Sequence, residues 1–146
     1  MGALELHLER VVNASRDVVF RMHSEPELFA RWWGPRGFTV SSVEADVRVG
    51  GTYRIEMQPP EGDAFFLSGE FVDVEAPARL SYTFRYEEPD PDDRENVVVF
   101  SLDDLGAATA VSVDQSPFAT EARLELHRQG WTETLERLAD AVTETR

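Results

Sequence analysis

The chain has 146 residues, with 28 acidic and 14 basic side chains, which gives a formal net charge of −14. A chain of this length fits a single domain, residues 1–146, that buries enough surface for one core. The negative charge excludes nucleic acid and anionic membrane surfaces as partners, because both are themselves negative. The absence of cysteine excludes disulfides, thiol catalysis and cysteine-based zinc sites.

The sequence contains no N-terminal apolar run of the signal-peptide kind and no stretch of about 18 apolar residues that would span a bilayer. We therefore expect a cytoplasmic protein. Part of the surplus acid is local, since Glu87–Glu95 holds six acidic residues and two prolines. This composition predicts an exposed hairpin tip.

The N-terminal region shows a strand pattern and then helix signals. Leu4–Val12 alternates apolar and polar side chains for most of its length, which predicts a strand. Ser15 has the right chemistry to cap a short helix that follows it. A second short helix is expected to begin near Glu25 and to run through Trp33, before Gly34–Gly37 ends it.

The middle of the chain consists of alternating segments separated by turn residues such as Gly50-Gly51. Short connections of this kind favour hairpins, and therefore a meander of antiparallel strands. The predicted strands are Phe38–Val47, Thr52–Gln58, Phe65–Glu75, Ala78–Tyr86, Asn96–Leu102 and Ala107–Gln115.

The C-terminal segment changes to helical periodicity. Spacings of three and four predict one long amphipathic helix within Phe118–Thr145. Gly130 lies inside it, where glycine costs about 1 kcal/mol relative to alanine, and we expect this glycine to let the helix approach the sheet. The expected fold is α+β: a curved antiparallel sheet of about seven strands, two short helices after the first strand, and the long helix over the concave face. The periodic stripe is Leu124, His127, Trp131, Leu135, Leu138 and Val142.

Three stretches carry a resemblance to a known family. They are Arg10 with Ala14 and Val19-Phe20, then Pro26-Glu27-Leu28 through Arg31-Trp32-Trp33-Gly34-Pro35, and finally Gly130-Trp131 with Leu135 and Leu138. On these residues the chain resembles the START/Bet v 1-like helix-grip superfamily. More narrowly, it is similar to the bacterial SRPBCC proteins related to the activator of Hsp90 ATPase (AHSA1-like proteins). This fold hosts ligand carriers, cyclases and chaperone cofactors alike.

The resemblance implies a cavity between the sheet and the C-terminal helix. Its expected wall is mostly apolar with a few polar groups, as in small-molecule sites. The same side chains would equally serve to fill a core, and the sequence leaves both readings open. The candidate ligand-binding residues are Phe38, Tyr53, Ile55, Met57, Phe66, Tyr82, Phe84, Val113, Gln115, His127 and Trp131.

Catalytic signals are sparse. Of the three histidines, His7 is expected to face solvent, His23 to lie in a linker between the short helices, and His127 to face the sheet. No histidine pair has metal-ligand spacing, and no phosphate-binding loop or nucleophile elbow occurs. The sequence therefore predicts no catalytic residue, no metal and no cofactor. Trp32 and Trp33 are interpreted as core and hinge packing.

The leading hypothesis is a non-enzymatic domain that binds a hydrophobic small molecule. The resemblance supplies one alternative, a chaperone (Hsp90) partner. Another alternative is a cyclase or aromatase-like enzyme that uses His127 or Tyr82 as an acid–base group. Either a monomer or a homodimer is compatible with the sequence.

Overall fold

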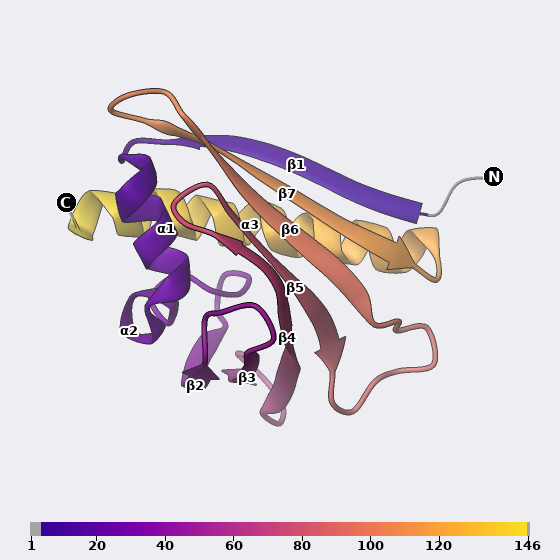
Figure 1. Ribbon diagram of the computed structural model, residues 1–146. Helices are drawn as coiled ribbons and strands as arrows, with labels where there is room; N and C mark the ends of the chain where they lie inside the picture. Colours follow the sequence, from indigo (N-terminus) through magenta and orange to yellow (C-terminus); the bar gives the residue numbers. More distant parts are fainter. Residues whose placement is uncertain (1–3, 146) are drawn as a thin grey trace.

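The computed structural model describes residues 4–145, which fold into a seven-stranded sheet and three helices (Figure 1). Each strand lies within three residues of its predicted ends. In chain order the elements are β1 Leu4–Val12, α1 Arg16–Ser24, α2 Pro26–Phe29, β2 Thr39–Ala45, β3 Thr52–Gln58, β4 Phe65–Glu75, β5 Arg79–Tyr86, β6 Asn96–Asp104, β7 Thr109–Phe118 and α3 Glu121–Thr145.

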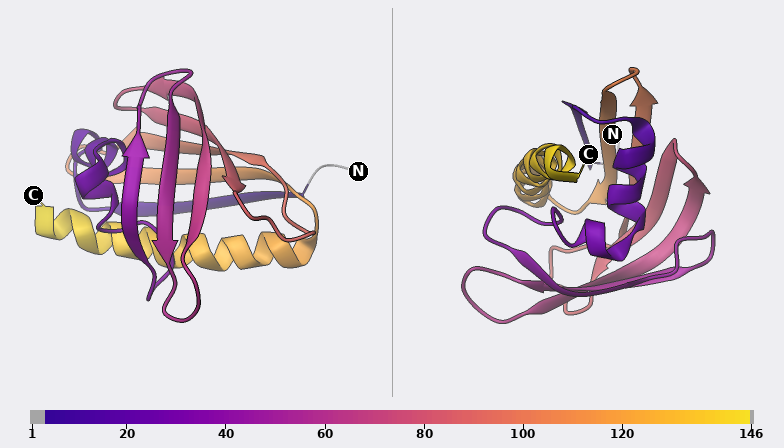
Figure 2. Two further views of the ribbon diagram at one scale, coloured as in Figure 1. Left: turned by 90° about the horizontal axis from the view of Figure 1, so that it is seen from below. Right: turned by 90° about the vertical axis from the view of Figure 1, so that its left-hand side faces the viewer.

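The sheet is antiparallel, with the strand order β1-β7-β6-β5-β4-β3-β2. Strands β2 to β7 form the predicted meander, and β1 returns beside β7. The sheet curls around α3, which lies in its concavity along β1 (Figure 2). The α+β helix-grip fold expected from the sequence is therefore confirmed.

The short helices cover the concave face beside α3. As predicted, Ser15 caps α1, and its side chain accepts a hydrogen bond from the Val18 backbone N–H. The second helix is shorter than predicted, because it ends at Phe29 and the chain continues in tight turns through Trp32. The Trp32 indole is fully buried and donates to the Met22 carbonyl at 2.8 Å, which fixes this turn against α1.

The last helix lies within the predicted range and has 25 residues. Strand β7 continues through Pro117 to Phe118, and α3 begins only at Glu121. Thr120 accounts for this start, because its hydroxyl accepts a hydrogen bond from the Arg123 backbone N–H and its carbonyl from Leu124. None of the helices within residues 4–145 is long and apolar enough to cross a membrane.

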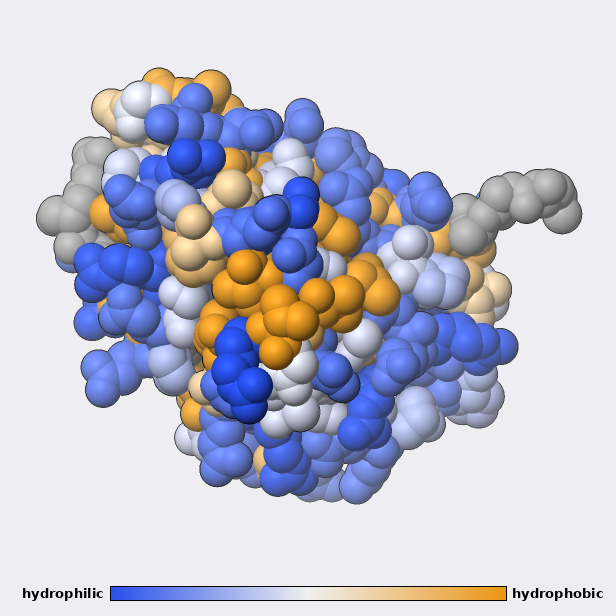
Figure 3. Space-filling view, in the orientation of Figure 1, coloured by the Kyte–Doolittle hydropathy of each residue, from blue (hydrophilic) through white to orange (hydrophobic). Residues whose placement is uncertain are grey.

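The face of the sheet turned away from α3 is mainly hydrophilic, with apolar side chains gathered near its middle (Figure 3). Val72 of β4 and Val97 of β6 are among the exposed apolar residues of the sheet. The acidic segment Glu87–Glu95 forms the β5–β6 connection, as predicted. Arg123 attaches it to α3, with 2.9 Å to the Asp90 carboxylate and 3.6 Å to that of Asp93.

Candidate functional site

The concave face contains two neighbouring hollows. The larger measures about 330 Å³ and lies between α3, the inner face of β3–β5 and the loop that follows α2. We call it the helix chamber. Its lining residues are Trp33, Gly34, Pro35, Phe38, Met57, Pro59, Phe65, Leu67, Phe84, Tyr86, Leu126, His127, Gly130, Trp131 and Thr134.

Three polar side-chain groups of the helix chamber have no hydrogen-bond partner within residues 4–145: the imidazole of His127, the hydroxyl of Tyr86 and the indole N–H of Trp33. The ring centroids of His127 and Tyr86 are 6.0 Å apart. Burial lowers the pKa of His127 to about 4, partly opposed by the charge of Asp93, so the ring is neutral at pH 7. Burial and then the same charge raise the pKa of Tyr86 to about 12, which keeps its hydroxyl protonated.

The other polar groups of this chamber are already engaged. The Thr134 hydroxyl donates to the Gly130 carbonyl at 2.7 Å, within α3. The Trp131 indole donates to the Gln115 side chain at 2.8 Å. Among the side-chain groups of this chamber, those of His127, Tyr86 and Trp33 are therefore available to a ligand without the loss of an existing hydrogen bond.

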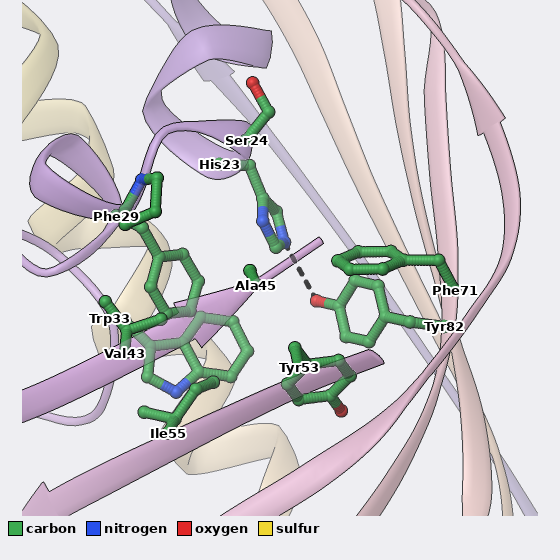
Figure 4. A pocket seen from close by; sticks show the side chains of 11 residues that line it. His23, Ser24, Phe29, Trp33, Val43, Ala45, Tyr53, Ile55, Phe71 and Tyr82 are labelled. Carbon is green, nitrogen blue, oxygen red and sulfur yellow. Dashed lines mark hydrogen bonds between the residues drawn. The ribbon is translucent and has the colours of Figure 1, made fainter. Parts of the chain in front are cut away.

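The smaller hollow measures about 30 Å³, which is room for about two water molecules. We call it the aromatic chamber. It lies between the short helices and β2–β5, with Phe29 and Trp33 on one side and Phe71 and Tyr82 on the other (Figure 4). Its lining residues are His23, Ser24, Pro26, Phe29, Trp33, Val43, Ala45, Tyr53, Ile55, Phe71 and Tyr82.

His23 and Tyr82 share the central hydrogen bond of the aromatic chamber, with 2.9 Å between His23 Nε2 and the Tyr82 hydroxyl. The imidazole also meets the Phe100 ring edge-on, with centroids 4.6 Å apart. Burial lowers the pKa of His23 to about 4 and raises the pKa of Tyr82 well above its usual range. Both groups are therefore neutral at pH 7, and each satisfies the other.

The loop between α2 and β2 forms one wall of the helix chamber, and Arg137 of α3 holds it in place. Arg137 Nη1 lies 2.9–3.2 Å from four carbonyl oxygens of this loop. Burial lowers the pKa of Arg137, and the neighbouring Arg36 lowers it further. The four carbonyls belong to Trp33, Gly34, Pro35 and Phe38.

Comparison with protein families gives a match over residues 13–143 to the model described as "Activator of Hsp90 ATPase homolog 1-like protein". The chain belongs to this family. No curated protein matches the sequence. The resemblance found in the three sequence stretches is thereby confirmed.

Solved structures of bacterial proteins share the fold of this AHSA1-like chain. Protein CV1439 from Chromobacterium violaceum is 27% identical with a TM-score of 0.86, and 94% of this chain covers 96% of that one. Protein NE0264 from Nitrosomonas europaea is 28% identical with a TM-score of 0.82, and the match covers 97% of this chain and 96% of that one. The AHSA1 protein SPO3351 from Silicibacter pomeroyi is 25% identical with a TM-score of 0.84, and the match covers 97% of this chain and 99% of that one.

The structure distributes the predicted site residues over both chambers. Phe38, Met57, Phe84, His127 and Trp131 line the helix chamber. Tyr53, Ile55 and Tyr82 line the aromatic chamber. Phe66, Val113 and Gln115 line neither.

Phe66 is corrected to Phe65. In the β3–β4 register Phe66 lies opposite Glu56, on the outer face of the sheet, where the Arg54 guanidinium stacks 3.7 Å from its ring centroid. Phe65 lies opposite Met57 and lines the helix chamber. The error has a simple origin, since alternation does not reveal which of two adjacent phenylalanines points inward.

Val113 and Gln115 belong to the core instead of a cavity wall. Val113 is fully buried under the helices. The side chain of Gln115 accepts from Trp131 and donates to Asn96 at 2.9 Å, so its amide is used within the protein. It is therefore not available as a polar group for a ligand.

Two further predictions change. His23 is not a linker residue, because it lies in the last turn of α1 and is buried. It follows Val19 by four residues and Phe20 by three, a helical spacing that would have placed it on the buried face. Gly130 approaches the loop instead of the sheet, since a Cβ there would lie 3.5 Å from Pro35 Cγ.

The arrangement offers little for acid–base or metal catalysis. His127 and Tyr82, the acid–base candidates of the cyclase alternative, line different chambers. At pH 7 a histidine with a pKa of about 4 is a weak base. Within residues 4–145 no group of three histidine or carboxylate side chains is arranged to hold a metal ion.

Proposed function

We propose that this protein binds one small, mainly apolar and uncharged molecule in the helix chamber. The observation that carries the proposal is the chamber itself. Its volume of about 330 Å³ falls within the range of about 300–1,000 Å³ that is usual for ligand sites. None of its lining residues is an acid or an arginine, so an ionic head group would lose its hydration there without gaining a partner.

The neighbouring unpartnered groups of His127 and Tyr86 define how a ligand would be oriented. Neutral His127 offers a hydrogen-bond acceptor, and the Tyr86 hydroxyl offers a donor. A hydroxyl on the ligand would complete both groups, because it can donate to the imidazole nitrogen of His127 and accept from the Tyr86 hydroxyl. The rest of the ligand would contact the apolar side chains of β3–β5 and α3.

A neutral fluorescent naphthylamine, N-phenyl-1-naphthylamine, tests this proposal because its emission rises when it enters an apolar site. The test variant is Gly130→Leu, which adds a side chain where α3 approaches Pro35 at the wall of the chamber. The matched control is Gln129→Leu, which adds the same side chain one residue away at an exposed position.

We expect one molecule of the dye to bind the wild-type protein and the Gln129→Leu control. We expect binding at least tenfold weaker in Gly130→Leu. Cooperative thermal unfolding should show that all three proteins are folded. Failure of the wild-type protein to bind either this dye or any member of a panel of lipophilic neutral molecules would contradict the proposal. Equal binding by the two leucine variants would place the bound dye outside the helix chamber.

A further inference from the structure

The two chambers are successive segments of one trough. On β3, Ile55 lines the aromatic chamber and Met57 the helix chamber. On β5, Tyr82 and Phe84 divide in the same way. Residues two apart on a strand share a face, so the chambers follow each other along the same inner surface of the sheet.

Trp33 stands between them. Of the described residues, it alone lines both chambers. Its indole stacks on Phe29 of the aromatic chamber, with centroids 4.7 Å apart, and meets Trp131 of the helix chamber edge-on at 5.2 Å. Figure 4 shows this ring beside Phe29, at the side of the aromatic chamber opposite Phe71. Trp33 is therefore the one described side chain that contributes to the walls of both chambers.

The attachment of Trp33 differs from that of the other two tryptophans. The indole N–H of Trp32 donates to the Met22 carbonyl, and that of Trp131 donates to Gln115. Within residues 4–145 the indole N–H of Trp33 has no hydrogen-bond partner, and ring contacts alone hold the side chain. Rotation of Trp33 thus breaks no hydrogen bond, whereas rotation of either neighbour would.

His127 and Tyr86 lie further along the helix chamber from Trp33. His127 precedes Trp131 by four residues, about 6 Å along α3, and Trp131 is the residue that touches Trp33. A ligand with its oxygen at His127 and Tyr86 would therefore direct its apolar part toward Trp33.

We propose that Trp33 determines the length of ligand that the protein accepts, as the end wall of the helix chamber. The ligand class is an uncharged molecule with one hydrogen-bonding oxygen and a linear apolar tail. This inference rests on the proposed function. Ligands whose tails end before Trp33 fill the helix chamber alone, and replacement of Trp33 by a small residue joins the two chambers into one longer site.

A series of straight-chain 1-alkanols, from about four to about twelve carbons, measures that length by calorimetric titration. Each methylene buried should tighten binding about fourfold. In the wild-type protein we expect affinity to increase along the series and then to level off where the tail meets Trp33. In Trp33→Ala and Trp33→Leu the increase should continue to longer alcohols, further in the alanine variant.

Val43→Ala is the matched control, because Val43 lines the aromatic chamber and not the helix chamber. This variant enlarges the aromatic chamber and leaves Trp33 in place, so its affinities should level off at the wild-type length. A second measurement uses the wild-type protein alone. In two-dimensional NMR spectra the indole N–H signal of Trp33, assigned with Trp33→Phe, should shift only with alcohols that reach the levelling length, while that of Trp32 stays unchanged.

The outcomes separate the two proposals. If the wild-type protein binds no alcohol of any length, the proposed function fails. Suppose instead that the wild-type protein binds the alcohols, but both Trp33 variants level off at the wild-type length or the Trp33 signal responds equally to short and long alcohols. The role of Trp33 is then rejected, and ligand binding stands. If Trp33→Ala and Trp33→Leu do not fold, the NMR measurement on the wild-type protein decides alone.

Discussion

Trp131 and Gln115 are joined by a buried hydrogen bond, in which the indole Nε1 on α3 donates to the side-chain oxygen on β7 across 2.8 Å. The amide of Gln115 then donates to Asn96, and the Asn96 amide to the Pro117 carbonyl. A chain of polar groups thus connects the long helix to β6 and β7 inside an apolar core. Buried polar groups stabilise a fold only while each of them has a partner.

Substitution of this amide should therefore be costly. Gln115→Leu keeps the side-chain size but leaves the Trp131 N–H and the Asn96 oxygen without partners. We expect the free energy of unfolding to fall by about 2 kcal/mol or more, since each buried unpaired group costs about 1–3 kcal/mol. Urea unfolding measures it, with the exposed Gln129→Leu as the control. A loss below about 0.5 kcal/mol would contradict the role assigned to this hydrogen-bond chain.

Acidification should destabilise the protein through His23. The pKa of His23 is about 4 in the folded state, against 6.5 for an exposed histidine in the unfolded chain. The unfolded chain therefore binds the proton more tightly. Stability is therefore complete above about pH 7 and falls as the pH drops from 6.5 toward 4, by up to about 3 kcal/mol. His127, with the same depressed pKa, acts in the same direction.

His23→Gln removes the titrating group and keeps a side chain that can hydrogen-bond Tyr82. We expect this variant to be less stable at pH 7 but to lose less stability between pH 7 and pH 4.5, as followed by chemical unfolding at each pH. His7→Gln is the control, because the exposed His7 has a pKa raised by its hydrogen bond to Asp114. An unchanged pH dependence in His23→Gln would show that the pKa of His23 is the same in the folded and unfolded states, against the depressed value expected from its burial.

The loop that walls the helix chamber should depend on Arg137. Arg137→Met preserves the aliphatic part of the side chain and removes the donors that reach the carbonyls of Trp33 and Gly34. We expect a loss of about 2–3 kcal/mol in unfolding free energy, because hydrogen bonds from a charged group are worth about 1.5–3 kcal/mol. Hydrogen exchange should accelerate in residues 33–38 more than in the sheet. Uniform acceleration would show that the arginine acts on the whole fold and not on the loop.

Gly130 offers a gain in stability. A Cβ at this position would lie 3.5 Å from Pro35 Cγ, which is ordinary van der Waals contact, so the helix can accept alanine without moving its neighbour. Because glycine in a helix costs about 1 kcal/mol relative to alanine, Gly130→Ala should raise the free energy of unfolding by up to that amount. Thermal and urea unfolding measure the change. A decrease would mean that Pro35 cannot tolerate even a methyl group.

The fold was predictable because its periodicities are local. Alternation in β3 and β5 and the three-and-four spacing of α3 lie within single segments of the chain, so the pattern alone indicates them. The site was less predictable because its geometry depends on pairing between segments. Gln115 reads as an inward polar residue, and only the pairing of β6 with β7, Val98 opposite Gln115, brings Asn96 within reach of its amide. Similarly, Phe65 is distinguished from Phe66 by its register with Met57.

The division into two chambers was not visible for another reason. Trp33 lies in an irregular turn, which has no repeat from which the direction of a side chain follows. The expectation that both tryptophans serve as packing describes Trp32, which is fully buried. It also describes Trp33, which is buried in the core, but it does not indicate that this side chain lines both chambers.

The sheet does not close on itself, and this has a consequence for how separate molecules meet. Its last strand, β2, has a neighbour on one side only, so its backbone amides and carbonyls are a template on which a second chain could add a strand. The irregular register between Val40 and Ser42 and the exposed charge of Glu44 interrupt that template. The net charge of −14 adds repulsion between copies. Resistance to aggregation in this protein is therefore electrostatic in part, and it weakens as ionic strength rises.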